Sequence, residues 1–181
     1  ALIKGDLDSI VVLHVYRSAR KEKIQFEFTR SNIAIEHVPY WGLNKEKIGY
    51  IRVTRFSKNS GKDFKTALKD LNEKGLKSLI IDLRSNSGGL LTSVVSILDN
   101  LTARGDTLLV QKGKTNRSNK IWTSRRSPII NQDIPIIVLI NRRSASASEI
   151  LAGTIQDLDR GVVLGQKSFG KGLVQHLYDL N

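Results

Sequence analysis

The chain contains no cysteine among its 181 residues, and it has no long apolar run. The missing cysteine excludes a disulfide framework and any chemistry that depends on a thiolate. No segment approaches the roughly 20 apolar residues that a membrane-spanning helix requires. Histidine is scarce, and its three copies, His14, His37 and His176, do not have the spacing of metal ligands. We therefore expect no metal and no other cofactor.

Acidic residues are outnumbered by basic ones, which gives a formal net charge of +12. A surplus of this size can indicate a nucleic-acid partner. The densest basic segments are 17–23 and 112–126, and the second surrounds Trp122, which could stack on a base. Its glycine, asparagine, serine and threonine content is more typical of a polar loop or hairpin. We therefore do not expect nucleic acid as the partner.

Hydrophobic periodicity predicts an α/β protein. Apolar residues recur at helical spacing in three segments: 60–75, 90–101 and 146–158. Strands are predicted, in chain order, at 10–16, 24–28, 48–53, 78–83, 107–110, 134–140, 162–164 and 173–178. From 48 onward strands and helices alternate, which indicates a largely parallel sheet. The first two strands flank a charged turn and form a separate pair.

Three serines follow the most apolar predicted strand, in the small-residue segment Ser144–Glu149 that opens a helix. Proteins of the α/β class place ligands at the ends of such strands. A serine becomes a nucleophile only when a base accepts its proton, and this segment holds no histidine. The lone Lys171 between two glycines can be that base if burial keeps it neutral. The alternative is that the serines are only helix caps.

The turn 82–89, with the sequence Asp-Leu-Arg-Ser-Asn-Ser-Gly-Gly, directly follows a predicted buried strand. Its paired glycines let backbone N–H groups approach a ligand, so beside a nucleophile the turn is a candidate oxyanion hole. The alternative is an ordinary strand-to-helix turn in which Asp82 pairs with Arg84.

Two other motifs overlap Lys171. Residues 165–171 fit the G-x-x-x-x-G-K phosphate loop, but Gly172 stands where that loop needs a hydroxyl for Mg²⁺. A predicted strand also follows, where the phosphate loop needs a helix. Residues 168–171 spell S-x-x-K, yet the flanking glycines disfavour the helix this motif requires, and its partner motifs are absent. Nucleotide binding and penicillin-binding chemistry are therefore the weaker interpretations.

Together these segments resemble the C-terminal processing peptidases, or tail-specific proteases, a Ser-Lys serine peptidase family that carries a PDZ module. Residues 82–91 look like its D-L-R-x-N-x-G-G-L-L turn, although Ser87 stands where the family often has proline. Residues 141–153 look like its N-x-x-S-A-S-A-S-E-I-x-A-G segment, and residues 165–175 like G-x-x-[ST]-F-G-K-G-x-V-Q.

The resemblance implies roles for individual residues. It makes Ser146 the nucleophile, Lys171 the general base and Gln175 the side chain that orients this lysine. It also implies that the oxyanion donors are two backbone N–H groups, one from Ala147 and one from either Gly88 or Gly89.

The same resemblance implies a fold and a domain organisation. We expect a crotonase/ClpP-like α/β protease core over residues 33–181, which family members extend beyond Asn181. Residues 1–32 are expected to be the C-terminal part of a truncated, β-rich PDZ module.

The expected function is a serine endopeptidase that cleaves proteins or peptides near accessible C-termini through an acyl-enzyme. The resemblance places it in the cell envelope, the periplasm or another extracytoplasmic compartment. Membrane association is an expectation for the full-length protein only, and oligomerisation is left open. The alternative is a non-catalytic peptide-binding or scaffold protein of the same fold.

Overall fold

The computed structural model describes residues 3–33, 36–115 and 118–175. The chain divides into two compact units, Ala1–Glu36 and His37–Asn181, each held by its own internal contacts. None of the helices in the described ranges is long and apolar enough to cross a membrane.

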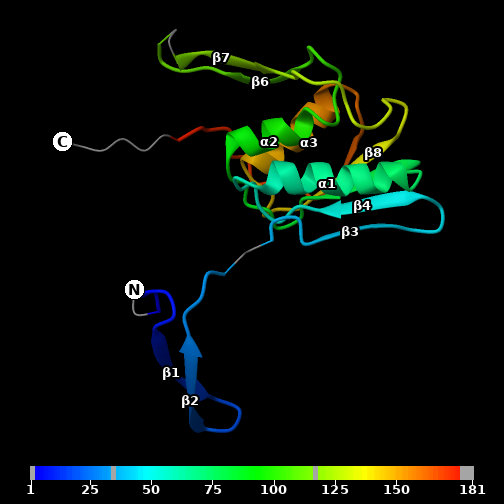
Figure 1. The fold of residues 1–181 in the computed structure, drawn as a ribbon. Coiled ribbons are helices and arrows are strands. Elements are labelled where there is room, and N and C mark those ends of the chain that lie inside the picture. The colour runs from blue at the N-terminus through cyan, green and yellow to red at the C-terminus, as the bar shows by residue number, and fades with distance from the viewer. Residues whose placement is uncertain (1–2, 34–35, 116–117, 176–181) are drawn as a thin grey trace. The chain divides into compact units, whose positions relative to one another are not determined.

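The first unit is an antiparallel hairpin of β1 (Ile10–Arg17) and β2 (Glu22–Thr29), which confirms the predicted strand pair (Figure 1). Arg30 closes its open end, because its guanidinium donates to Ile3 O and Ser9 Oγ at 2.9 and 2.8 Å. Several large apolar side chains of the hairpin are exposed: Ile10, Val12, Val15, Tyr16 and Phe28.

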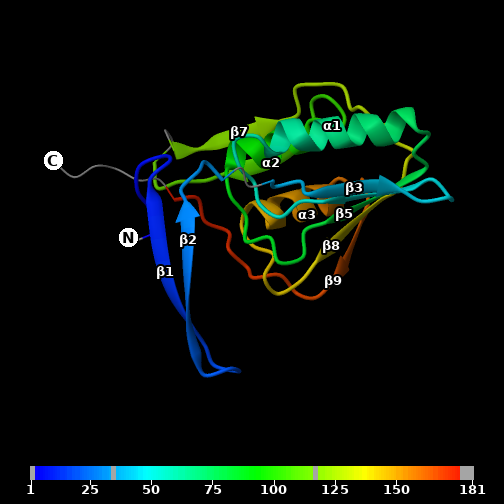
Figure 2. The same ribbon diagram turned by 60° about the horizontal axis from the view of Figure 1, so that its bottom comes forward.

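The second unit is built on a five-stranded sheet with the order β3-β4-β5-β8-β9 (Figure 2). Its strands are β3 (Tyr40–Leu43), β4 (Ile48–Arg52), β5 (Ser78–Asp82), β8 (Ile136–Ile140) and β9 (Val162–Gly165). All neighbours are parallel except β3, which pairs antiparallel with β4 at one edge. The predicted largely parallel sheet is therefore confirmed, with one additional edge strand.

In the described part of the chain, three helices form a layer against this sheet (Figure 2): α1 (Ser60–Glu73), α2 (Leu91–Leu98) and α3 (Ala147–Asp157). Helix α1 packs on β3 and β4, α3 packs on β8 and β9, and α2 contacts both α1 and α3. Alternate sheet residues that face the helices are fully buried or nearly so: Ile51, Leu79, Ile81, Ile136 and Val138. Burying each such side chain contributes about 1.5–3 kcal/mol to the stability of the folded state. The packing of helices on the sheet therefore holds the strand ends, which carry the site, in place.

The basic segment 112–126 belongs to a hairpin, as one of the two sequence interpretations proposed. Strand β6 (Thr107–Gln111) pairs antiparallel with β7 (Lys120–Thr123). The Lys120 ammonium lies 3.7 Å from the centre of the Trp122 ring. One face of the Trp122 ring is therefore already covered by a cation of the same strand.

Helix α1 begins at Ser60, the start of the predicted segment 60–75; Ser60 is the first residue of the helix and not its cap, and its hydroxyl donates to Ser57 O at 2.9 Å. One strand prediction is wrong. The predicted strand at 173–178 is absent over residues 173–175, which have no regular secondary structure. A strand needs a partner edge for its backbone groups, and residues 173–175 have none among the described strands. Residues 176–178, with His176, lie outside the described residues.

Candidate active site

A cavity of about 650 Å³ opens beside the N-terminal end of α3. One face of α3 and the residue before it form its first wall: Ser146, Glu149, Ile150, Gly153, Thr154 and Asp157. Residues 107–110 of β6 form a second wall, and residues 170–172 form a third. The fold thus brings Ser146 and Lys171 to the same cavity from separate segments. Asp157, the last residue of α3, also lines it.

Ser146 adopts an unusual backbone conformation, with φ of 56° and ψ of −114°. A non-glycine residue in such a region stores on the order of 1–3 kcal/mol of strain. Its N–H donates to the carboxylate of Glu149 at 2.7 Å. Sharp, strained turns that lead from a strand into a helix are a known way to present a catalytic serine.

The three serines of the segment have different surroundings. Ser144 and Ser148 are fully buried, and their hydroxyls donate to Leu83 O and Asn86 O, each at 2.8 Å. Ser146 is half-buried, and its Oγ donates a hydrogen bond to none of the described residues. Ser144 and Ser148 are therefore structural, while Ser146 occupies the N-cap position of α3 and lines the cavity.

The glycine turn lies directly against the serine segment. A Cβ at Gly88 would fall 2.7 Å from Ala145 O, 2.9 Å from Ser146 Cβ and 3.1 Å from Ala147 N. Only glycine fits there, and its φ of 101° favours glycine as well. Gly89 has a φ of 145° and packs against the Phe56 carbonyl. The predicted oxyanion residues are thus neighbours of Ser146 in space.

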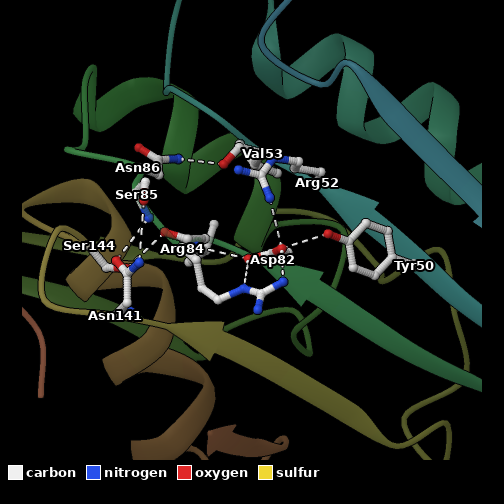
Figure 3. A network of polar contacts seen from close by, with 10 residues as sticks. Tyr50, Arg52, Val53, Asp82, Arg84, Ser85, Asn86, Asn141 and Ser144 are labelled. Carbon is white, nitrogen blue, oxygen red and sulfur yellow. Dashed lines mark hydrogen bonds and ion pairs between the residues drawn. The ribbon is translucent and has the colours of Figure 1, made fainter. Parts of the chain in front are cut away.

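One of the predicted oxyanion donors is already engaged. The Gly88 N–H donates to Asn86 Oδ1 at 2.8 Å. The buried Asn86 side chain also donates to Val53 O at 2.9 Å (Figure 3). The backbone carbonyl of Asn86 accepts from Ala145 N. Asn86 therefore joins the end of β4, the glycine turn and the serine segment. Asn86 was not predicted as a functional residue, although it lies inside the turn motif 82–89.

Asp82 anchors the start of the same turn through a fully buried carboxylate (Figure 3). It accepts from Tyr50 Oη at 2.6 Å, from Arg52 Nη1 at 3.0 Å and from Arg84 Nη2 at 2.8 Å. Burial alone would raise the pKa of Asp82, but the hydrogen bonds from Arg84 and Tyr50 outweigh it and lower the pKa to about 2. The predicted pairing of Asp82 with Arg84 is thus present, and it fixes the turn.

Lys171 reaches Gln175 through a hydrogen bond of 3.0 Å from Nζ to Oε1. Its Nζ makes no hydrogen bond to Ser146 Oγ, although both residues line the cavity. Residues 172–175 do not form the helix that a phosphate loop requires after its lysine.

Glu149 connects the serine segment to the lysine segment. Besides Ser146 N, its carboxylate accepts from Ser168 Oγ at 2.7 Å, Gly170 N at 2.5 Å and Lys171 N at 2.8 Å. Burial would raise the pKa of Glu149, but these hydrogen bonds lower it below its usual value. No role was predicted for this residue from the sequence. Its spacing of three residues after Ser146 fits a capping box and was the available signal.

Comparison with known proteins identifies the family. Residues 47–181 match peptidase family S41. The chloroplastic C-terminal processing peptidase of Tetradesmus obliquus is 33% identical over 99% of this chain and 41% of its own length. The chloroplastic carboxyl-terminal-processing peptidase 1 of Arabidopsis thaliana is 37% identical over 99% of this chain and 37% of its own length.

A solved structure supports the same family. The photosystem II D1 C-terminal processing protease matches with a TM-score of 0.70 and 31% identity, over 97% of this chain and 48% of that one. The chain belongs to peptidase family S41, which confirms the family predicted from sequence. Its mixed α/β fold is the fold of S41 proteases. The chain spans less than half the length of these relatives.

Proposed function

We propose that this chain carries the active site of a serine endopeptidase that uses Ser146 as nucleophile and Lys171 as general base. The observation that carries the proposal is the shared cavity, in which Ser146 is the one serine of its segment without a structural hydrogen bond from its hydroxyl. Lys171 lines the same cavity from a separate segment of the chain. A movement of Lys171 Nζ toward Ser146 Oγ would complete the dyad, since catalytic hydrogen bonds often tighten only when substrate binds.

The reaction follows from these positions. Lys171 accepts the proton of Ser146 Oγ, which attacks the scissile carbonyl carbon and forms a tetrahedral oxyanion. The N–H of Ala147 and an N–H of the glycine turn stabilise this oxyanion. Gly89 is the better second donor, because the Gly88 N–H is held by Asn86. The oxyanion then collapses, the scissile C–N bond breaks, and protonated Lys171 protonates the leaving amine. A water attacks the acyl-enzyme with Lys171 as base; the ester C–O bond breaks, Lys171 returns the proton to Ser146 Oγ, and the product leaves with a new C-terminal carboxylate.

Gln175 suits the role of orienting the base. Its amide oxygen accepts a hydrogen bond from Lys171 Nζ at 3.0 Å. The amide carries no charge, so it favours the ammonium form less than a carboxylate would. A lysine held in this way can still release its proton.

For the substrate, we propose proteins or peptides cleaved near accessible C-termini, since the relatives are named for C-terminal processing. The extracytoplasmic location is proposed on the same relatives, some of which are chloroplastic. We retain residues 33–181 as a crotonase/ClpP-like core and residues 1–32 as the end of a PDZ module. The antiparallel β1–β2 hairpin supports the assignment of residues 1–32 to a larger β-rich module. A two-stranded pair is only marginally stable alone, so it is expected to be part of a larger sheet.

A peptide-cleavage assay tests the proposal. A labelled peptide with a free C-terminus should be cleaved by the wild-type protein and not by Ser146→Ala. Binding of the peptide by both proteins, with cleavage by neither, would instead support the non-catalytic scaffold.

A further inference from the structure

The carboxylate of Glu149 lies between the two segments that carry the proposed dyad. Its Oε2 accepts from Ser146 N and Lys171 N, at 2.7 and 2.8 Å. Its Oε1 accepts from Ser168 Oγ and Gly170 N, at 2.7 and 2.5 Å. One side chain therefore bonds to the backbone of the proposed nucleophile and to the backbone of the proposed base.

A role as helix cap explains only a part of this arrangement. A capping glutamate at this position needs one bond, from the N–H of the residue that precedes the helix. Three of the four donors to Glu149 come instead from residues 168–171, which form neither helix nor strand. Besides them, the described backbone bonds of this segment include Phe169 N to Ser144 O at 3.0 Å. Glu149 thus supplies most of the hydrogen bonds that hold the lysine segment.

We propose that Glu149 is a positioning residue, which docks residues 168–171 on the N-terminal end of α3 and so sets the place of Lys171 beside Ser146. The proposal rests on the function proposed above for Ser146 and Lys171. Glu149 acts on the dyad through backbone groups, because its carboxylate contacts neither Ser146 Oγ nor Lys171 Nζ by a hydrogen bond in the described chain.

The chemistry of the four donors requires an ionised carboxylate. Each carboxylate oxygen faces two donors, and a carboxylate has only acceptors to offer. Glutamine has the same shape but replaces one oxygen by an NH₂ group. The hydrogens of this group would face the two donors that the lost oxygen had accepted from, so those two hydrogen bonds could not form. The Glu149→Gln variant should therefore release the segment although it fills the same space.

The test combines amide hydrogen exchange with steady-state kinetics on the full-length protein. In Glu149→Gln, the exchange protection of the Gly170 and Lys171 amides should fall at least about tenfold. In the same variant, kcat should fall by about 30-fold or more while KM stays within about threefold, because positioning of the base is lost and substrate contacts are kept. Unchanged protection at these two amides, or a kcat within about twofold of wild type, would overturn the proposal.

Two other variants serve as controls. Glu73→Gln makes the same chemical change at the exposed end of α1 and should alter neither readout. Ser168→Ala removes one donor and leaves both backbone bonds to Glu149, so its losses should be smaller than those of Glu149→Gln. A loss in Ser168→Ala that equals the loss in Glu149→Gln would contradict the proposed role of the backbone bonds.

The exchange measurement also separates this proposal from the proposed function. If the wild-type protein shows no turnover, the proposed peptidase function fails, while the exchange data still decide whether Glu149 anchors the segment. If Glu149→Gln does not fold, acidification of the wild type replaces it. Protection of Gly170 and Lys171 should then fall as Glu149 is protonated, while Phe169, bonded to Ser144 O, keeps its protection. Asp157 and Lys171 are the other charged groups of this cavity.

Discussion

Gly88 lies against Ser146 so closely that a Cβ on the glycine would fall 2.9 Å from Ser146 Cβ. The glycine turn after β5 and the serine turn before α3 are therefore packed as one unit. Their relative position is held by Asn86, which accepts from Ala145 N and from Ser148 Oγ. A substitution in the glycine turn should therefore shift the position of Ser146, although Ser146 itself is unchanged.

Replacement of Gly88 by alanine should lower both activity and stability. The new methyl group would collide with Ala145 O and Ser146 Cβ, and the φ of 101° disfavours alanine. We expect kcat/KM to fall by about tenfold or more and the free energy of unfolding by about 1–3 kcal/mol. Gly75→Ala is the matched control, because Gly75 also has a positive φ of 84° but has open space around it. It should lose stability and keep kcat/KM, and equal losses of activity in both variants would argue against the packing explanation.

The three serines should respond differently to alanine. Ser144→Ala and Ser148→Ala each remove one of two hydrogen bonds to a buried carbonyl, since Leu83 O keeps the bond from Asn86 N and Asn86 O keeps the bond from Ala145 N. Each should therefore reduce the free energy of unfolding by about 0.5–1.5 kcal/mol and retain measurable turnover. Ser146→Ala should abolish turnover and change stability by less than about 0.5 kcal/mol. Thermal or urea unfolding, measured beside peptide cleavage, separates these outcomes. Residual cleavage by Ser146→Ala at the level of Ser144→Ala would mean that the nucleophile is misassigned.

The Asp82 network should make the fold sensitive to acid. The folded-state pKa of Asp82 is lowered from 3.8 to about 2, so its stabilisation is complete above about pH 4 and is lost as the pH falls toward 2. The shift corresponds to at most about 2 kcal/mol, and to about 1 kcal/mol once solvent screening of the half-exposed arginines is considered. Urea unfolding between about pH 5 and pH 2 measures this stabilisation, because that range spans the unfolded and the folded pKa of Asp82. Asp82→Asn should be less stable than wild type at pH 5 and should lack this contribution to the slope. If the free energy of unfolding falls with pH at the same slope in Asp82→Asn and in the wild type, the assigned role of Asp82 would be contradicted.

Lys171 should tolerate no cationic substitute. Lys171→Ala should lower kcat by about a hundredfold or more, because Ser146 loses its proton acceptor. Lys171→Arg should not restore activity, since a guanidinium stays protonated. Gln175→Ala should cost less than either change, because Gln175 only accepts a hydrogen bond from the lysine. The kcat values of the three variants, measured with one peptide, test the order.

Sequence patterns predicted those parts of the fold that depend on regular burial. The runs at 48–53, 78–83 and 134–140 became β4, β5 and β8, because each supplies apolar residues to the sheet face that is buried under the helices. Strand β3 was missed because it is short, contains Gly42 and buries none of its residues fully. The segment 173–175 was misread because its alternating pattern says nothing about whether a partner edge exists.

The predicted site depended on recognising motifs, which mark residues but not their contacts. The motifs marked the serine segment, the glycine turn and the lysine segment, and the structure places them together. The roles of Asn86 and Glu149 could not be predicted, because their hydrogen-bond partners come from segments distant in the chain. The distinction between Ser146 and its neighbours also depends on such contacts with residues 83–86.

Mass spectrometric mapping of a fluorophosphonate adduct tests the central claim most directly, since the probe reacts with an activated serine hydroxyl. Ser146 should carry the adduct in the wild-type protein and in Ser144→Ala. Lys171→Ala should show much slower labelling, and Ser146→Ala should show none in the segment Ser144–Glu149. An adduct on Ser144 or Ser148, or labelling of Ser146 at the wild-type rate in Lys171→Ala, would contradict a Ser146–Lys171 dyad.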